Sequence, residues 1–342
     1  MKMTGAKMVV ESLHQEGVEV VFGYPGGAIM NVYDEIYKQN YFQHILNRHE
    51  QASIIAAEGY ARATGKVGVS IVTSGPGFTN AVTGLADAYM DSIPLVVISG
   101  QVPTTIIGSD GFQEIDAVGI SRPCTKHNYL VNKIEDLPRI IKEAFHIAST
   151  GRPGPVHVDI PKDITAQIAE FVYPSEVNMP TYKPTVNYNK RQLKKAMEAI
   201  SNAKKPLLYV GGGSVLSNCS FEIRELAKKL NIPAVETLMA RGVMGDENPL
   251  FFGMLGMHGE FAANMAAHET DLLISLGARF DDRVTGRLDE FASKAKVIHI
   301  DIDPTSIAKL VVADYPIVGD LKITVKAMIE DAENYEINDF SN

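Results

Sequence analysis

Three short segments near the start of the chain place glycine beside polar side chains that could do chemistry. Residues 23–28 read Gly-Tyr-Pro-Gly-Gly-Ala, residues 48–51 read Arg-His-Glu-Gln, and residues 73–80 read Thr-Ser-Gly-Pro-Gly-Phe-Thr-Asn. Glycine allows positive φ and lets a ligand lie against the main chain, so the two glycine-rich segments are candidate ligand turns. The carboxylate of Glu50 stands between them in the sequence, where it could cap a helix, bind a metal ion or act on a bound ligand.

Glu50 has two ordinary explanations. The pair His49-Glu50 suggests zinc, but the H-E-x-x-H motif needs a histidine where this chain has Ser53, so a zinc site is not supported. An acidic residue at the start of the helix expected at 51–64 would also interact favourably with the helix dipole. Taken alone, the residue types leave both the helix cap and the ligand-binding role open.

The glycine segments also have simpler explanations. Turns between a strand and a helix often contain glycine without binding anything. A dinucleotide fingerprint is not supported, because the spacing G-x-G-x-x-G is absent from residues 23–28. Ser74 is not the nucleophile of a serine hydrolase, because Val72 stands where the motif needs glycine.

The composition narrows the class of protein. A chain of 342 residues is long for one core and suggests two domains. Its hydrophobic content of 45% and charged content of 21% are typical of soluble globular proteins. A formal net charge of −9 argues against nucleic acid or an anionic membrane as partner, and no apolar run reaches the length of a membrane span. Cys124 and Cys219 lie far apart, which fits a reducing cytoplasm.

The segments between these features alternate between apolar strands and helical patterns. Most of the expected strands are apolar throughout, as in parallel sheets covered on both faces. The expected strands are 18–22, 67–73, 95–99, 156–160, 207–210, 272–276 and 297–301, and the expected helices include 51–64, 137–149, 190–201, 220–230 and 305–311. The pattern predicts an α/β protein with two doubly wound parallel-sheet domains.

A proline-rich polar stretch interrupts this alternation. Residues 171–189 contain three prolines and little periodicity, which indicates a linker. We therefore expect one domain at 1–170 and a second at 190–342, with the acidic tail 330–342 as the start of a further linker.

The second half contains a possible nucleotide site. Gly211-Gly212-Gly213, Gly277-Ala278-Arg279 and Asp301-Ile302-Asp303 each follow an expected strand. Ligands of open α/β sheets bind at the carboxyl ends of strands, where backbone and arginine suit phosphate and a carboxylate suits ribose hydroxyls. Three ordinary turns would give the same pattern, so this site stays open on the residues alone.

Taken together, the motifs resemble one enzyme family along nearly the whole chain. The matching motifs are Pro25-Gly26-Gly27-Ala28, Arg48-His49-Glu50-Gln51-Ala52, Thr83-Gly84-Leu85-Ala86-Asp87-Ala88, Gly100-Gln101-Val102-Pro103, Phe112-Gln113-Glu114, Gly151-Arg152-Pro153-Gly154-Pro155, Ile160-Pro161-Lys162-Asp163, Ala278-Arg279-Phe280-Asp281-Asp282-Arg283 and His299-Ile300-Asp301-Ile302-Asp303-Pro304. This set resembles the catalytic subunits of acetolactate synthases (acetohydroxyacid synthases), which are thiamine-diphosphate enzymes.

The resemblance implies roles for the first domain. Residues 1–170 would bind the pyrimidine end of thiamine diphosphate, with Gly26 and Gly27 beside it. Glu50 would hydrogen-bond the aminopyrimidine ring and favour the tautomer that activates the cofactor. The implied reaction decarboxylates pyruvate and joins the product to pyruvate or 2-oxobutyrate, giving 2-acetolactate or 2-aceto-2-hydroxybutyrate, in branched-chain amino acid biosynthesis.

Three further residues match the family's substrate approach. They are Phe112, Gln113 and Lys162, and a lysine there would attract a carboxylate substrate. A packed core aromatic for Phe112 and a solvated loop charge for Lys162 are the alternatives.

The resemblance also implies FAD in the second domain, although the net reaction needs no redox chemistry. The implied FAD contacts are Arg152, Gly212, Gly213, Thr237, His258, Gly277, Arg279, Asp281, Asp301 and Asp320. Synthases that work without FAD differ around residues 279–286, so the chain is similar to the biosynthetic, flavin-containing type.

These enzymes carry a third domain whose Gly-Asp-Gly…Asn motif binds the diphosphate through Mg²⁺, and this sequence has no such motif. We therefore expect a partial chain that is inactive alone and supplies no metal ligands. The family further implies a homodimer or tetramer and a possible small regulatory subunit. Two alternatives stay open: a related enzyme such as pyruvate oxidase or oxalyl-CoA decarboxylase, and a non-catalytic flavin- or nucleotide-binding protein.

Overall fold

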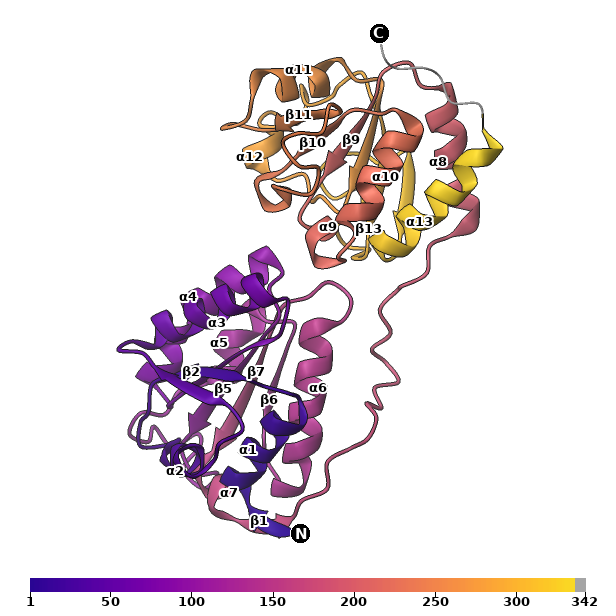
Figure 1. Ribbon diagram of the computed structural model, residues 1–342. Coiled ribbons are helices and arrows are strands. Elements are labelled where there is room, and N and C mark those ends of the chain that lie inside the picture. Colours follow the sequence, from indigo (N-terminus) through magenta and orange to yellow (C-terminus); the bar gives the residue numbers. More distant parts are fainter. Residues whose placement is uncertain (336–342) are drawn as a thin grey trace. The chain divides into compact units, whose positions relative to one another are not determined.

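The computed structural model describes residues 1–335, and these fold as two compact units that divide between Lys183 and Pro184 (Figure 1). Each unit is an α/β structure built on its own six-stranded sheet. This arrangement confirms the predicted fold class. Within the described residues, no helix combines the length and the apolar character that a membrane crossing needs.

The first unit is built on a parallel sheet in the order β3-β2-β4-β5-β7-β6. Its strands are β2 Val20–Gly23, β3 Gln43–Leu46, β4 Gly68–Val72, β5 Leu95–Gln101, β6 His127–Leu130 and β7 Pro155–Pro161, and a separate antiparallel pair joins β1 Lys2–Thr4 to β8 Ile168–Glu170. The three central strands β4, β5 and β7 are buried at every residue, which explains why most of their residues are apolar.

Helices cover both faces of this sheet (Figure 1). They are α1 Gly5–Gln15, α2 Met30–Lys38, α3 Glu50–Thr64, α4 Pro76–Asp91, α5 Ala117–Ser121, α6 Leu137–Ser149 and α7 Lys162–Ala166. Successive residues of β5 face opposite sides: Val96 packs in the core that includes α1 and α6, and Val97 in the core that includes α3 and α4. The sheet is therefore doubly wound.

The second unit has the strand order β11-β10-β9-β12-β13-β14, again all parallel. Its strands are β9 Pro206–Val210, β10 Ala234–Glu236, β11 Phe251–Met254, β12 Leu272–Leu276, β13 Lys296–Asp301 and β14 Tyr315–Val318. Its helices are α8 Lys190–Asn202, α9 Gly213–Leu216, α10 Ser220–Leu230, α11 Phe261–Glu269, α12 Asp282–Thr285 and α13 Leu321–Asp331. Helices α8, α10 and α13 contribute to one core, and α11 to the core on the other face.

The strand order reverses between β2 and β4 in the first unit and between β9 and β12 in the second. In open α/β sheets, ligands bind outside the carboxyl ends of the strands at this switch point. We therefore expect ligand sites at the turns that follow these four strands.

One predicted helix is wrong. Residues 305–311 form turns rather than a helix, and Ala308 has a positive φ of 55°. The Asp303 carboxylate accepts hydrogen bonds from the backbone N–H and hydroxyl of Thr305, which stabilises a turn here.

The two inferred linkers differ from one another in the structure. Residues 171–189 form neither helix nor strand. At the tail, Glu330 and Asp331 still belong to α13, so the predicted linker does not begin there. The rest of that prediction, from residue 336 onward, lies outside the described residues.

Candidate cofactor sites at the two switch points

Glu50 is the first residue of α3 and is buried, with 7% of its surface exposed. The cap of this helix is supplied by the neighbouring His49, whose Nδ1 accepts a hydrogen bond from the Gln51 N–H at 3.2 Å. The Glu50 carboxylate is instead bound by Asn80 of α4, which donates from Nδ2 to Oε2 at 2.9 Å. Capping therefore does not account for this carboxylate.

The other carboxylate oxygen of Glu50 lies beside the second glycine turn. A Cβ at Gly77 would lie 3.4 Å from Glu50 Oε1 and 2.6 Å from Cγ2 of Thr73. The hydroxyl of Tyr33 donates to the Ile71 carbonyl at 2.9 Å, and burial together with the charge of Glu50 raises its pKa well above the ordinary value. The buried Glu50 carboxylate is thus held by Asn80 on one side and lies beside Gly77 on the other.

The two glycine turns meet at Thr73, directly after β4. A Cβ at Gly26 would lie 2.5 Å from Thr73 Cβ, and the Ala28 N–H donates to Thr73 Oγ1 at 3.3 Å. Gly27 is exposed and faces open space. The structure therefore brings Gly26, Gly27 and Glu50 to the switch point between β2 and β4.

The predicted substrate residues lie at the same edge of the sheet. Residues 102–116, which we call the β5–α5 segment, pass beside the second turn: a Cβ at Gly75 would lie 2.6 Å from the Gln113 carbonyl oxygen. Phe112 is 88% exposed, so it is not a packed core aromatic. Lys162 is the exposed first residue of α7, directly after β7.

Asn80, Thr73 and Tyr33 are site residues that the sequence reasoning did not assign. Asn80 and Thr73 belong to the glycine segment already singled out, so their proximity to the turn was a signal. Tyr33 gave no such signal, because its hydroxyl reaches the site only through the pairing of β2 with β4.

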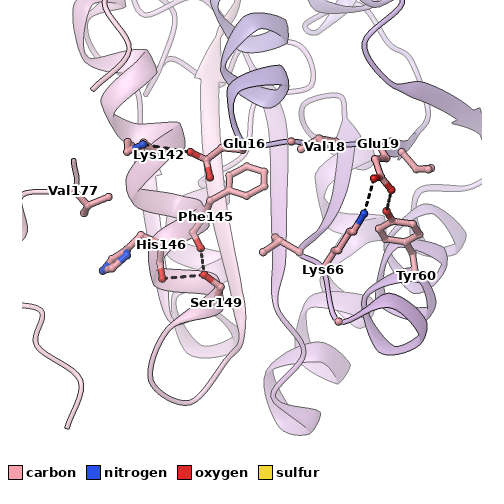
Figure 2. Close-up of a pocket in the computed structure, with 14 residues that line it drawn as sticks. Glu16, Val18, Glu19, Tyr60, Lys66, Lys142, Phe145, His146, Ser149 and Val177 are labelled. Carbon is pink, nitrogen blue, oxygen red and sulfur yellow. Dashed lines mark hydrogen bonds and ion pairs between the residues drawn. The ribbon is translucent and has the colours of Figure 1, made fainter. Parts of the chain in front are cut away.

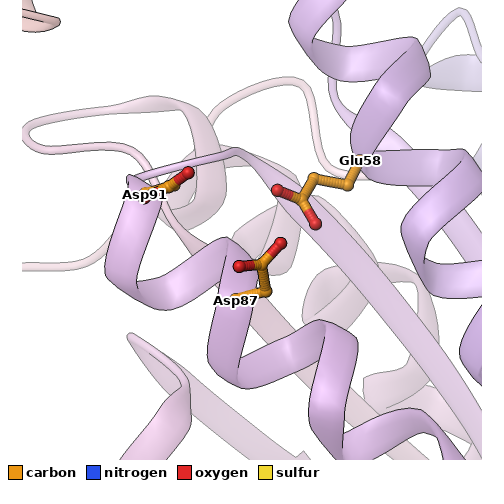
Figure 3. A group of neighbouring side chains, drawn as sticks. All are labelled: Glu58, Asp87 and Asp91. Atoms are coloured by element: carbon orange, nitrogen blue, oxygen red, sulfur yellow. The ribbon is translucent and has the colours of Figure 1, made fainter. Parts of the chain in front are cut away.

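A group of acidic side chains, Glu58, Asp87 and Asp91, joins α3 to α4 (Figure 3). The guanidinium of Arg62 lies against two of them, with Nη2 at 2.5 Å from Glu58 Oε1 and 2.6 Å from Asp91 Oδ2. Burial raises the pKa of Glu58, and Asp87 raises it further, while Arg62 opposes both effects. The group is an ion-pair network that ties together the two helices carrying Glu50 and Asn80.

A cavity of about 540 Å³ occupies the opposite edge of this sheet (Figure 2). Its walls include Val18, which precedes β2, Val67, which precedes β4, and Phe145 near the end of α6. The charges in its walls are paired, as in the ion pair of 2.6 Å between Lys66 and Glu19. Because it adjoins the amino ends of the strands, this cavity does not belong to the Glu50 site.

In the second unit, most of the predicted flavin residues lie at the carboxyl edge of the sheet. Each of these follows one of its six strands. They are Gly212 and Gly213 after β9, Thr237 after β10, His258 after β11, Gly277, Arg279 and Asp281 after β12, Asp301 at the end of β13 and Asp320 after β14. The sheet topology thus brings to one edge nine residues that are spread along the sequence from Gly212 to Asp320.

The switch point of this sheet is lined by closely approaching backbone. Gly277 has a φ of 67°, and a Cβ there would lie 2.8 Å from the Gly213 Cα. The Gly213 N–H donates to the Gly277 carbonyl at 3.0 Å. Beside them, the buried Oγ1 of Thr237 has no hydrogen-bond partner. A glycine cradle with an unpaired hydroxyl fits a polar nucleotide ligand.

Three of the predicted flavin contacts already have hydrogen-bond partners within the chain. Asp281 and Asp320 already cap α12 and α13, through hydrogen bonds from Arg283 N–H and Ile323 N–H. Arg152 belongs to the first unit, where its Nε donates to Ser92 Oγ at 2.7 Å. Neither unit by itself therefore brings Arg152 together with the other nine residues.

Comparison with known proteins gives one family match within each of the two units. Residues 3–120 match the family described as "Thiamine pyrophosphate enzyme, N-terminal TPP binding domain", and residues 193–328 match "Thiamine pyrophosphate enzyme, central domain". The chain is 55% identical over 323 residues to an acetolactate synthase large subunit of Haemophilus influenzae, covering 94% of this chain and 56% of that protein.

Two further relatives give the same result. The chain is 52% identical over 330 residues to the acetolactate synthase isozyme 3 large subunit of Escherichia coli, covering 96% of this chain and 58% of the relative. It is also 52% identical over 336 residues to an acetolactate synthase of Mycobacterium leprae, covering 98% and 54%. The chain spans a little over half the length of these relatives. It belongs to the thiamine pyrophosphate enzymes, of which it contains the N-terminal and central domains, and is a homologue of the acetolactate synthase large subunits.

Proposed function

We propose that this chain supplies the pyrimidine-binding and flavin-binding domains of an acetolactate synthase catalytic subunit. The reaction would decarboxylate pyruvate and condense the product with pyruvate or 2-oxobutyrate, giving 2-acetolactate or 2-aceto-2-hydroxybutyrate. The observation that carries the proposal is the buried carboxylate of Glu50, bound by Asn80 between two glycine turns at a sheet switch point. The homology to acetolactate synthases selects this reaction among those of the wider family.

The residues around Glu50 fit the pyrimidine ring of thiamine diphosphate. When bound, this cofactor supplies the carbon nucleophile that attacks a 2-oxo acid. Glu50 would hold a proton between Oε1 and a ring nitrogen, while Asn80 fixes the other oxygen by its hydrogen bond. Gly26 and Gly77 let both turns pack closely against Thr73, since a Cβ at either position would collide with its side chain, and this packing brings the two turns together beside Glu50.

Phe112, Gln113 and Lys162 would form the approach for the 2-oxo acid. Lys162 is exposed at the carboxyl end of β7, where its ammonium group would attract the substrate carboxylate. The apolar ring of Phe112 would shield the reacting carbon from water.

The second unit would bind FAD at its switch point. Gly212, Gly213 and Gly277 would let the diphosphate approach the backbone, with Arg279 near its charge. Thr237 Oγ1 would gain the hydrogen-bond partner that it lacks in the protein alone. Asp301, Asp281, Asp320, His258 and Arg152 complete the proposed set of contacts.

The remaining partners are proposals drawn from the same family. We propose that the Mg²⁺ and diphosphate of the cofactor are held by a further domain, and that the assembly is a homodimer or tetramer with a possible small regulatory subunit. A cytoplasmic location stays a prediction from the cysteine content.

The deciding experiment expresses this chain with and without the diphosphate-binding domain of a homologous synthase. Acetolactate formation from pyruvate is assayed with thiamine diphosphate, Mg²⁺ and FAD, and flavin binding is followed separately by fluorescence. We expect activity with the added domain and flavin binding in both preparations. Flavin binding without activity in either preparation would favour a non-catalytic flavin-binding protein.

A further inference from the structure

The β5–α5 segment, which carries Phe112 and Gln113, is irregular, and it is held at both ends by aspartates of a single strand–helix corner. At its start, the backbone N–H of Thr104 donates to Asp163 Oδ1 at 2.9 Å, and its hydroxyl donates to Oδ2 at 2.6 Å. Partial burial raises the pKa of Asp163, but these hydrogen bonds outweigh that effect and hold the pKa below its ordinary value. Asp163 thus binds Thr104 with both carboxylate oxygens.

The far end of the segment is held through Gln101, the last residue of β5. Its Nε2 donates to the Ile115 carbonyl at 2.9 Å and to Asp159 Oδ2 at 2.9 Å. Its Oε1 accepts from the Val102 N–H at 2.8 Å. Gln101 and Asp159 are 4% and 1% exposed, so water does not compete for these groups. The Gln101 amide therefore has a single orientation that joins Ile115 to Asp159.

A buried chain of hydrogen bonds through Ser99, His157 and Ser121 holds the Asp159 carboxylate in place. Ser99 Oγ donates to Asp159 Oδ1 at 2.5 Å and lies 2.7 Å from His157 Nε2, and His157 Nδ1 lies 2.9 Å from Ser121 Oγ. Burial lowers the pKa of His157 to about 3, so this imidazole is neutral at pH 7. Ser99 is completely buried and lies between the Asp159 carboxylate and the His157 imidazole. These three residues are therefore not a catalytic triad in which the serine is the nucleophile and the histidine its base.

The carboxylate of Glu114 stabilises the middle of the segment by accepting two backbone hydrogen bonds. Glu114 Oε2 accepts from the Gly111 N–H at 2.8 Å, and Oε1 accepts from the Gly108 N–H. Glu114 therefore ties residues 108–114 together, and the position of this stretch depends on the attachments at Thr104 and Ile115.

We propose that Asp159 and Asp163 are positioning residues that hold the β5–α5 segment against the Gly75 turn and so place Phe112 and Gln113. Both aspartates flank Lys162 along the β7–α7 corner. The β7–α7 corner thus determines the positions of all three residues of the proposed substrate approach, Phe112, Gln113 and Lys162. The substrate role of these three residues rests on the proposed function, whereas the anchoring of the segment does not.

The first test uses a fluorescent reporter on the segment. The chain contains no tryptophan, so Phe112→Trp introduces a single one. We expect Asp163→Ala and Gln101→Met, each added to Phe112→Trp, to increase the amplitude of fast nanosecond anisotropy decay about twofold. Ser121→Ala is the matched control, because it alters the buried chain but leaves the links from Gln101 to Asp159 and Ile115. Unchanged anisotropy in both test variants would overturn the proposal.

Hydrogen exchange gives an independent readout with Phe112 intact. Amides of residues 104–116 should exchange about tenfold faster in Gln101→Met, with β4 and β5 unchanged. Gln101→Met leaves Asp159 and its hydrogen bond from Ser99 in place, so this test does not require a variant of the buried aspartate to fold. Wild-type exchange of the segment in Gln101→Met would contradict anchoring through this residue.

The active assembly with the added domain tests the substrate link. Gln101→Met should raise the KM for pyruvate about tenfold with a smaller change in kcat, because the approach is disordered while Glu50 is untouched. If the mobility tests show a more mobile segment in Gln101→Met but its KM for pyruvate is unchanged, the proposed positioning role is wrong. If the wild-type assembly forms no acetolactate, the proposed function fails, and the two mobility tests still decide the anchoring.

Discussion

The proposed chemistry of this protein depends on one side chain, Glu50, whose surroundings support that role. Asn80 occupies Oε2, and a glycine stands where any larger residue would approach Oε1. A glutamine in this place has the same shape and can still accept the hydrogen bond from Asn80, but it cannot share a proton with a ring nitrogen.

We expect Glu50→Gln to keep the fold and to lower acetolactate formation by the active assembly by roughly 10²- to 10⁴-fold, the range of general acid–base catalysis. Activity is measured with the added domain, and FAD binding by the second unit serves as the control for folding. Near-wild-type turnover in this variant would remove Glu50 from the mechanism.

Asp159 is the residue with the clearest pH dependence. Burial, with a smaller contribution from the charge of Asp116, raises its pKa to about 7, because the hydrogen bonds from Ser99 and Gln101 only partly oppose these effects. Between about pH 4 and pH 7 the folded protein therefore keeps a proton on Asp159 that the unfolded chain releases. The free energy of unfolding should fall as the pH rises through this window, by up to about 1.4 kcal/mol per pH unit from this group.

Denaturant titrations from pH 4 to 8 check this expectation against Asp159→Asn, which cannot titrate. The difference in unfolding free energy, wild type minus variant, should decrease between pH 4 and 7 and level off above pH 7. A difference that is constant across the window would contradict the raised pKa.

At the scale of elements, the close contact between the turns after β9 and β12 forms the floor of the proposed flavin site. Gly277→Ala would place a Cβ 2.8 Å from Gly213 Cα at a φ of 67°, so both strain and collision oppose it. We expect a loss of about 1–3 kcal/mol of stability and at least tenfold weaker FAD binding. Flavin fluorescence titration and thermal unfolding measure the two effects.

Gly286→Ala is the matched control for backbone strain. Its φ of 56° is similar, but a Cβ there meets nothing within 4 Å. It should lose stability without weakening FAD binding to the same extent. Equal losses of flavin affinity in the two variants would mean that strain alone, and not the approach of the two turns, determines binding.

At the scale of the whole molecule, the two units have separate cores. The buried clusters of the first unit contain no residue of the second, and each unit has the size of an ordinary domain. We therefore expect residues 1–183 and 184–342 to fold when expressed separately, each with a cooperative thermal transition followed by circular dichroism.

A chain of residues 1–154 is the control, because it lacks the central strand β7 and should not fold. The absence of a cooperative transition in either complete unit would show that the units depend on one another for stability.

The sequence predicted the long apolar strands well but missed short or polar ones such as β3 Gln43–Leu46 and β10 Ala234–Glu236. In β3 no residue is fully buried, so its pairing with β2 leaves little apolar pattern to detect. The false helix at 305–311 had helical periodicity, which the local hydrogen bonds of Asp303 and the positive φ of Ala308 override.

Sequence alone determined the alternation of strands and helices, the two doubly wound sheets, and Glu50 between two glycine turns. These follow from local patterns, because burial on both faces requires apolar runs and tight turns require glycine. Tertiary structure decided which groups meet: Asn80 with Glu50, Gly277 with Gly213, and Asp159 with Ile115 through Gln101. The physical reason is that these contacts depend on the order of strands across each sheet, which no local stretch of sequence encodes.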